Sequence, residues 1–357
     1  MDFADSQYFR SGNSQYRSLD AYWHPVAYGS EVRESPVQVT LLDRQLVLGR
    51  INERLVALDD RCAHRGAALS SGKIVDDCFE CPFHGWRFDS QGNCAHAPGS
   101  NASKSVLSKS RILNYPVVES AGLIWVCLEQ VPQYALPKFP EYSEAGYRTR
   151  PGIAFEWETS VSRCVENLID ISTFSSDNDS RGETVKDELR WVETWWEKST
   201  LCFESPLLEN GRIFRMLEAV GVAGASRSAL TDTYRVGIPG TVHRRRMIGD
   251  GEKCYVLFFA ASPITTTRTR CFWSYSRNFS ESEEYDSLFL EGVLNDLASR
   301  RSIVESQFPK IVPICGGERQ RESLVCSYDT PIHHYRNALL ESSRLHLRSR
   351  EDWSDCS

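Results

Sequence analysis

Short runs rich in apolar, β-forming residues follow one another through the first third of the chain, a pattern typical of β-strands. These stretches span residues 37–42, 45–50, 55–58 and 123–128, and turn-forming residues separate them. The sequence therefore predicts a small antiparallel β-domain over residues 21–130. A proline-bearing connector at 131–140 indicates a domain boundary. Residues 1–20 are polar, and we expect an arm that is mobile or ordered only by a partner.

The rest of the chain, residues 141–357, combines helical and strand patterns. A three- and four-residue spacing runs from Val161 to Ser172, which predicts an amphipathic helix. The residues at this spacing are Val161, Cys164, Val165, Leu168, Ile169 and Ser172. A second helix is expected over about 281–306, and long β-runs lie between residues 189 and 279. Because a sheet with two flanking helices is an α+β arrangement, the predicted fold class is α+β.

Composition narrows the class of protein. Of the 357 residues, 41% are hydrophobic and 25% are charged, the balance of an ordinary globular protein with room for about two domains. The formal net charge of −7 argues against nucleic-acid binding, and no apolar run approaches the ~20 residues of a membrane span. The N-terminus lacks a signal-peptide pattern, so we expect a cytoplasmic location, where twelve cysteines suggest metal binding before disulfides.

The sharpest chemical motif is a pair of short segments, Cys62-Ala63-His64 and Cys81-Pro82-Phe83-His84. Each segment supplies one thiolate and one imidazole. In a Rieske [2Fe–2S] centre two histidines replace two of the four cysteines on one iron, so this pairing predicts such a cluster with Cys62, His64, Cys81 and His84 as its ligands. Tetrahedral zinc is the alternative, but zinc sites usually group like ligands in one C-x-x-C and one H-x₃₋₅-H unit.

Other residues near this motif have structural interpretations. Gly66, Gly72 and Gly85 fall where the loops must turn tightly, and such turns need residues that tolerate positive φ. Cys78 and Cys94 are close enough in sequence to be mistaken for ligands. We interpret both as small apolar residues of the core.

Residues 62–72 (CAHRGAALSSG) and 81–88 (CPFHGWRF) resemble the N-terminal domain of Rieske non-heme iron oxygenase α-subunits. The cytochrome bc branch fits less well, because its extra pair of bridging cysteines is missing: position 83 is Phe, and no Cys closely follows His64. The resemblance extends to residues 23–27, the helix around Asn167 and residues 303–307. It implies a Rieske domain followed by a curved antiparallel sheet domain of helix-grip type that holds a mononuclear iron, assembled as trimers or larger rings.

The iron site is where this sequence departs from the family, which holds its mononuclear iron with two histidines and one carboxylate. The resemblance aligns Thr173 and Asn178 with the two histidines and Arg300 with the carboxylate. A hydroxyl, an amide and a guanidinium cannot replace two imidazoles and an anion around Fe(II). We therefore expect this chain to lack a mononuclear Fe(II) of its own.

Four aspartates near these positions keep alternatives open. Asp177, Asp179 and Asp296 could supply metal ligands, although an all-oxygen shell suits Mg, Ca or Mn better than oxygen-activating iron. The family has an aspartate at the position of Asp170, where it bridges electron transfer between the Rieske histidine of one subunit and the iron histidine of the next. A carboxylate can accept hydrogen bonds from two imidazoles. The alternative for Asp170 is a solvated helix residue or a packing remnant.

Two further patterns have a functional and a plainer interpretation. The basic run from His243 to Arg246 could dock an acidic ferredoxin or reductase, but a solvated hairpin end is the favoured interpretation. Aromatic residues of the β-runs could line a substrate cavity, although such residues more often belong to the core of a sheet. These aromatic residues are Trp191, Trp195, Trp196, Phe258, Phe259, Phe272 and Trp273.

Together these features predict a Rieske oxygenase-type subunit that carries electrons through its [2Fe–2S] cluster to the mononuclear iron of a neighbouring, catalytically complete homologue. A reductase or ferredoxin would supply the electrons, and the assembly would be a trimer or hetero-oligomer. One alternative is an active mono- or dioxygenase with rearranged iron ligands that hydroxylates or demethylates a small hydrophobic substrate. Another is a stand-alone Rieske electron carrier or redox-sensing binding protein.

Overall fold

The computed structural model describes residues 16, 18–98, 109–171, 192–206, 217, 222, 231–248, 251–280, 282–312 and 329–354. The chain divides into two compact units, residues 1–136 and 137–357, and the division falls inside the proline-bearing segment 131–140. Within the described residues, no helix has the length and apolar character needed to cross a membrane.

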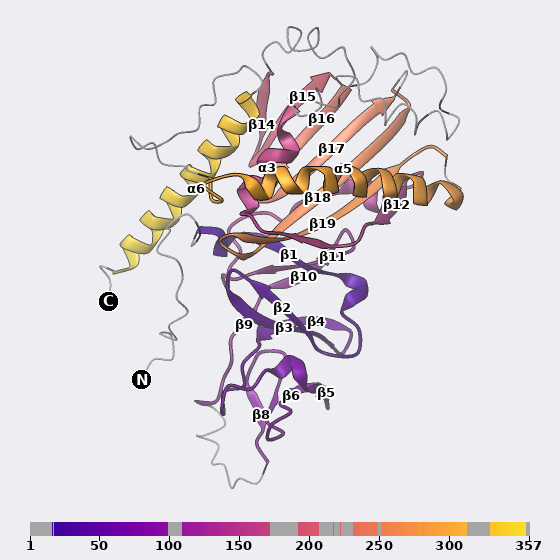
Figure 1. The fold of residues 1–357 in the computed structure, drawn as a ribbon. Helices are drawn as coiled ribbons and strands as arrows, with labels where there is room; N and C mark the ends of the chain where they lie inside the picture. Colours follow the sequence, from indigo (N-terminus) through magenta and orange to yellow (C-terminus); the bar gives the residue numbers. More distant parts are fainter. Residues whose placement is uncertain are drawn as a thin grey trace. The chain divides into compact units, whose positions relative to one another are not determined.

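Three small antiparallel sheets form the N-terminal unit (Figure 1). The first has the strand order β1 (Trp23–Tyr28), β11 (Leu123–Cys127), β10 (Val117–Ser120). The second has the order β2 (Val37–Leu41), β3 (Arg44–Ile51), β4 (Arg54–Asp59), β9 (Asn114–Tyr115). The third has the order β5 (Lys73–Val75), β6 (Cys78–Glu80), β7 (Arg87–Phe88), β8 (Cys94–His96). Short 3₁₀ turns accompany them: η2 (Leu19–Ala21), η3 (Gly29–Glu31) and η4 (Leu69–Ser71).

Two-residue turns connect β2 to β3 and β3 to β4. Leu42 and Asp43 in the first turn, and Asn52 and Glu53 in the second, all have positive φ. Two consecutive residues with positive φ are typical of type I′ turns, whose twist matches that of the flanking strands. The strands predicted between residues 37 and 58 are therefore confirmed, and these turns fix their pairing register.

Part of the polar N-terminal segment packs into the core of this unit. Tyr16 and Leu19 are buried in the same hydrophobic cluster as Val26, Leu46 and Ile124. The expectation of a free arm up to residue 20 is wrong for these described positions, because their large apolar side chains are removed from water on folding.

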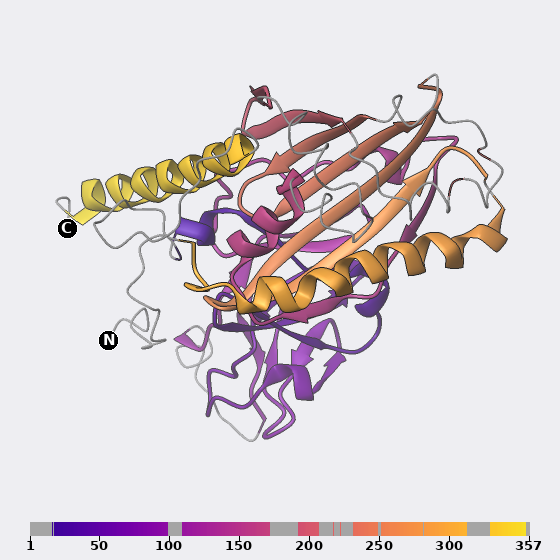
Figure 2. The same ribbon diagram turned by 45° about the horizontal axis from the view of Figure 1, so that its top comes forward.

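The C-terminal unit is built on one eight-stranded antiparallel sheet (Figure 2). Its order is β12 (Arg148–Pro151), β19 (Arg268–Arg277), β18 (Lys253–Thr265), β17 (Thr241–Ile248), β16 (Thr231–Gly237), β15 (Thr200–Pro206), β14 (Thr194–Glu197). A further strand, β13 (Phe155–Trp157), also pairs with β19. Strands β14 to β19 follow one another in sequence, so the sheet is a meander of antiparallel neighbours.

Helices cover one face of this sheet (Figures 1 and 2). Helix α3 (Val161–Ile169) lies against β17, β18 and β19 and contacts α5 (Asp286–Ser306) and α6 (Thr330–Ser354). The two helices predicted from the apolar spacing are confirmed as α3 and α5, whereas α6 was not predicted. Ser160 begins α3 as its N-cap, accepting a hydrogen bond from the Arg163 N–H. The 3₁₀ turns η5 (Pro140–Tyr142) and η8 (Glu283–Tyr285) complete the described elements of this unit.

Both faces of the central strand β18 are buried. Tyr255, Leu257 and Phe259 belong to the main hydrophobic cluster with the helices. On the opposite face, Phe258 stacks on Phe139, with ring centroids 4.8 Å apart. A segment that precedes the sheet in sequence therefore covers this face, and β18 reads as a nearly continuous hydrophobic run.

The basic run from His243 to Arg246 lies inside strand β17, so its interpretation as a solvated hairpin end is wrong. His243 and Arg246 are both buried. His243 Nε2 is 2.9 Å from a Glu141 carboxylate oxygen, and Arg246 donates two hydrogen bonds of 2.6 Å to Asp232. Buried polar and charged side chains need such hydrogen-bond partners. Because neighbouring residues of a strand point to opposite faces of the sheet, the residues of this run do not share one surface.

The aromatic residues of the β-runs divide into two groups. Phe258, Phe259, Phe272 and Trp273 are buried, as the core interpretation predicted. Trp195 and Trp196 are exposed, which corrects that interpretation for the edge strand β14. An edge strand has a neighbour on one side only and buries less of its side chains. Trp191 lies outside the described residues.

Candidate metal centre

The two cysteine and histidine motifs form two loops with the same backbone pattern. In the first loop the Cys62 N–H donates to the carbonyl of Ala67 (2.9 Å), and the Gly66 N–H donates to the carbonyl of Cys62 (2.9 Å). The second loop repeats both bonds five and four residues after Cys81, with lengths of 2.8 and 3.0 Å. Each loop therefore closes on its own cysteine and holds its histidine in a fixed turn.

The three loop glycines serve two different purposes. Gly66 and Gly85 have φ values of +73° and +69°, as the tight turns predicted. Gly72 has a φ of −95°, so its expected positive φ is wrong. A Cβ at Gly72 would lie 2.0 Å from the carbonyl oxygen of Glu80, which leads into the second loop. Glycine is needed at this position for close approach of the two segments.

The side chains of the two loops form a buried pair of cysteines and an exposed pair of histidines. Cys62 and Cys81 are each 3% exposed, whereas His64 and His84 are exposed to solvent. The two imidazole centroids are 4.8 Å apart, and the His64 ring stacks on Trp86 with an interplanar angle of 8°. The structure thus brings all four predicted residues together, with the cysteine sulfurs buried and the histidine rings exposed to solvent.

The environment of the thiols suits ligands that ionise only when a metal is bound. Burial raises the pKa of the Cys62 thiol to about 11, the N–H groups of His64 and Arg65 lower it, and the neighbouring Cys81 thiol raises it further. Burial, His84 and Arg65 together lower the pKa of His64, which favours the neutral imidazole that a metal requires. Amide N–H groups directed at the sulfur are among the features that set the potential of an iron–sulfur cluster.

This donor set fits a cluster of two metal ions better than a single ion. Two buried thiols and two exposed imidazoles match the two-plus-two ligation of a [2Fe–2S] centre, in which each iron takes only two protein ligands. Across the described residues, no group of three or more His, Cys, Asp or Glu side chains is placed to hold one metal ion. Cys78 and Cys94 are buried and outside both loops, in agreement with their core interpretation.

In the C-terminal unit, Arg300 occupies the position that the resemblance aligns with the iron carboxylate. Its side chain is buried between α5 and α3. The Nη1 group donates to the backbone carbonyl of Asn167 (2.9 Å) and to its side-chain oxygen (3.3 Å), and Nε pairs with Asp296 (3.4 Å). A permanently charged guanidinium therefore fills the space beside α3, and Asp296 is engaged by it.

A second group of buried charges lies beside Arg300. Glu166 of α3 accepts hydrogen bonds from Arg336 of α6, one of them 2.5 Å long, and from Arg163 (3.2 Å). Arg163 also donates to the backbone carbonyl of Pro309. Sequence reasoning missed this group, because Arg336 lies 170 positions from Glu166 in the chain and no local motif connects them.

Asp170, the candidate electron-transfer bridge, follows the last residue of α3 and is partly exposed. Thr173, Asn178, Asp177 and Asp179 lie outside the described residues. Of the positions that the resemblance assigns to the iron site and its electron-transfer bridge, the structure therefore describes Asp170 and Arg300.

A family model for the Rieske [2Fe–2S] domain matches residues 22–118. This range includes both loops and all four candidate ligands. The class of protein is thereby defined: the N-terminal unit is a Rieske domain, and such a domain supports a [2Fe–2S] cluster.

Whole-chain comparisons extend this result. Methylxanthine N1-demethylase NdmA of Pseudomonas putida is 27% identical over 319 residues, 84% of this chain and of the relative. The oxygenase component of dicamba O-demethylase from Stenotrophomonas maltophilia is 34% identical over 153 residues, 42% of this chain and 44% of the relative. The structure of NdmA with caffeine has the same fold, with a TM-score of 0.80, 24% identity and 94% coverage of each chain. The chain as a whole is homologous to Rieske non-heme iron oxygenase subunits, and the predicted fold class is confirmed.

Proposed function

We propose that this chain is an electron-transferring Rieske oxygenase subunit without a mononuclear iron of its own. Cys62, His64, Cys81 and His84 would hold the cluster. When bound, a [2Fe–2S] cluster of this kind supplies one-electron transfer. The buried cysteines keep water away from the sulfur ligands, and the exposed histidines offer a short path for an electron to or from a partner protein. The Rieske domain, homology to oxygenase subunits and the fit of the four donors support this proposal.

The burial of Arg300 is the observation that carries the second half of the proposal. A guanidinium has no free lone pair to offer a metal and remains charged at any physiological pH. Its hydrogen bonds to both oxygens of Asn167 fix it against α3, so a dication beside it would meet a fixed positive charge that only the 3.4 Å pair with Asp296 offsets. We infer that oxygen is not activated in this unit.

The electron acceptor would then lie in another chain. We infer a partner subunit of the same family with a complete set of two histidines and one carboxylate, in a trimer or hetero-oligomer that a reductase or ferredoxin supplies. We propose that Asp170, which is partly exposed at the end of α3, accepts hydrogen bonds from imidazoles of two chains.

Metal analysis of the purified chain tests the proposal. We expect two irons and two acid-labile sulfides per chain, as a [2Fe–2S] cluster requires, and a Rieske EPR signal after reduction with dithionite. Nitric oxide should give no EPR signal of a mononuclear ferrous site. A Cys81→Ala variant is the control, because it should lose the Rieske signal. Three irons per chain, with a nitrosyl signal that survives in the control, would overturn the proposal.

Co-purification from the native cell tests the heteromeric assembly. We expect a second, iron-bearing homologue to be retained with this chain, and Asp170→Asn to slow electron delivery to it while the Rieske EPR signal stays unchanged. A chain that is always isolated alone would contradict this part of the proposal and favour a stand-alone carrier.

An active oxygenase with rearranged ligands is the second candidate, because relatives with 27% and 28% identity over more than four-fifths of the chain are demethylases. On this alternative the chain would hydroxylate or demethylate a small hydrophobic substrate, with Asp296 and nearby aspartates as ligands. The nitric oxide experiment separates the two candidates directly, since only the active form requires a ferrous ion outside the cluster.

A further inference from the structure

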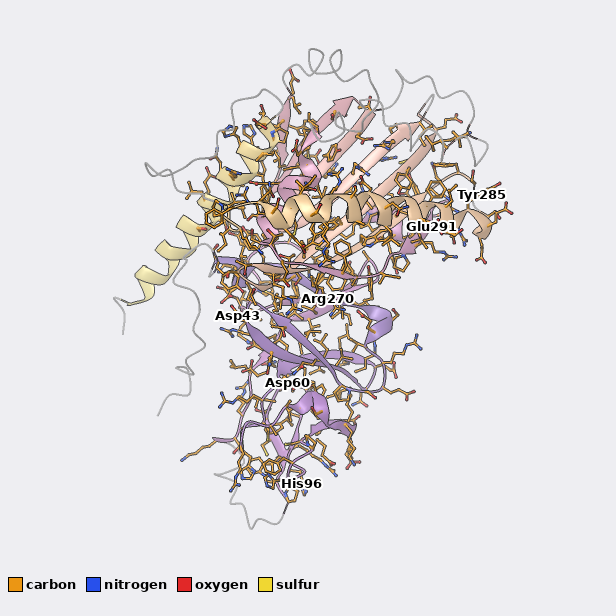
Figure 3. The ribbon with its side chains drawn as sticks, viewed as in Figure 1. Asp43, Asp60, His96, Arg270, Tyr285 and Glu291 are labelled. Carbon is orange, nitrogen blue, oxygen red and sulfur yellow. The ribbon has the colours of Figure 1, made fainter. Side chains whose placement is uncertain are left out.

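A buried carboxylate lies next to the first candidate cluster loop. Asp60, labelled in Figure 3, follows strand β4, precedes Cys62 by two residues and is 3% exposed. Its backbone N–H donates to the carbonyl of Gln45 on the neighbouring strand (3.0 Å). The backbone of Asp60 is therefore fixed by the sheet, and the family motif assigns it no role as a ligand.

The Asp60 side chain joins the two ends of the loop that carries Cys62 and His64. Its Oδ1 accepts from the Ser70 N–H (2.7 Å), and its Oδ2 accepts from the Ser70 hydroxyl (2.5 Å). A third donor, Gln38 Nε2 on strand β2, reaches Oδ2 at 2.7 Å. Because Ser70 follows the loop and Asp60 precedes it, these bonds hold the two ends of the loop together.

Three groups donate hydrogen bonds to the Asp60 carboxylate, and all three are neutral: the Ser70 N–H, the Ser70 hydroxyl and the Gln38 amide. None of the cationic side chains in the described part of the chain forms an ion pair with this carboxylate. Arg61, the next residue, is exposed and forms no hydrogen bond or ion pair with Asp60. A buried negative charge that hydrogen bonds hold, and no cation cancels, is weakly screened by solvent.

We propose that Asp60 is a positioning residue of the cluster site, and that its buried negative charge lowers the reduction potential of the cluster this loop holds. The inference rests on the proposed function of Cys62, His64, Cys81 and His84. It adds a residue that touches no metal but acts on the cluster through the loop and through its electric field.

The physical reason is electrostatic. Reduction adds one electron to the cluster, so the reduced form carries more negative charge than the oxidised form. A nearby buried anion disfavours that added charge and moves the potential to a more negative value. Net charge and hydrogen bonding around the ligands are the features through which a protein sets such potentials.

The test is a redox titration of the Rieske EPR signal in the full chain, with dithionite as the one-electron donor. Asp60→Asn removes the charge but keeps an acceptor for the Ser70 N–H, while Gln38 and the Ser70 hydroxyl can reorient toward the new amide. We expect its midpoint potential to be more positive than that of the wild type. Asp77→Asn is the matched control, because Asp77 is exposed in the same unit and its φ of +58° suits asparagine.

A second variant keeps the test decisive if Asp60→Asn loses its cluster. Gln38→Lys places an ammonium group beside the carboxylate from an exposed strand position, and it changes the net charge by the same amount as Asp77→Asn. We expect Gln38→Lys also to shift the potential to a more positive value than the control.

Three outcomes would decide the inference. A fully loaded Asp60→Asn protein with the potential of the control overturns it. If that variant holds no cluster, a Gln38→Lys potential equal to the control overturns it, and a more positive one supports it. A wild-type chain without a Rieske signal would instead refute the proposed function, so the two failures are distinguishable.

Discussion

Replacing Arg300 by leucine removes the contact that ties helix α5 to helix α3, and we expect the free energy of unfolding of the C-terminal unit to fall by at least about 2 kcal/mol. Hydrogen bonds to charged groups contribute ~1.5–3 kcal/mol, and leaving a buried acceptor unpaired carries a similar cost. One nitrogen of Arg300 serves both oxygens of Asn167, so we count them as a single interaction. The Asp296 pair, at 3.4 Å and partly solvated, adds less than ~1 kcal/mol.

Urea unfolding followed by tryptophan fluorescence measures this change, since Trp157 and Trp273 are buried in the C-terminal unit. Arg301→Leu is the matched control, because Arg301 is the next residue of the same helix, 54% exposed in its side chain and paired only with Glu305 among the described residues. We expect the control to change stability by less than ~1 kcal/mol. Equal effects of the two substitutions would refute the reasoning.

Three further predictions follow from buried groups of both units. Burial lowers the pKa of His24 to about 4. The stability that its neutral form supports is therefore complete above the unfolded pKa of ~6.5 and declines as the pH falls toward 4. The free energy of unfolding, measured with urea, should fall by about 2–3 kcal/mol between pH 7 and about pH 4.5, and His24→Gln should abolish that loss. Gly72→Ala should lower the iron content per chain, because its Cβ would meet the Glu80 carbonyl at 2.0 Å, and full iron content would contradict the close-approach argument. Hydrogen bonds from three arginines outweigh burial and hold the pKa of Asp286 well below its ordinary value. The stability that the ionised carboxylate supports is therefore present above the ordinary pKa and lost only below it. Asp286→Asn should lower the free energy of unfolding in urea by about 3 kcal/mol at neutral pH, and an unchanged midpoint would contradict this.

The two loops that carry Cys62, His64, Cys81 and His84 are the part of the site that could be predicted from the sequence. Each loop is a local object: the cysteine, the histidine two or three residues later and the glycine four residues after the cysteine fix both the donors and the turn that presents them. Short β-runs separated by turn residues similarly predicted the strands of the N-terminal unit, because both patterns depend on residues that are neighbours in the chain. Gly72 was assigned the wrong reason, since its requirement comes from a segment eight residues away.

The buried charges of the C-terminal unit were beyond the reach of local patterns. Arg336 meets Glu166 across 170 positions, and Arg300 meets Asn167 across 133. A basic run such as His243 to Arg246 looks solvated when only its charge is considered, and only the partners Glu141 and Asp232 explain its burial. Helix α6 was missed for a related reason, because its polar residues outnumber the apolar ones that pack inward.

Asp60 differs from three carboxylates of the C-terminal unit in how its charge is balanced, and this difference bears on what each unit does. In the C-terminal unit, Glu166, Asp232 and Asp286 each face one or more arginines, so their charges are largely cancelled and contribute to holding helices and strands together. In the N-terminal unit, Asp60 is held by neutral donors and keeps an uncancelled charge two residues from Cys62. A charge that is cancelled stabilises a structure, whereas an uncancelled buried charge acts on any nearby group that changes its own charge. Electron transfer is such a change, so this pattern favours redox chemistry in the first unit and a structural use of charge in the second.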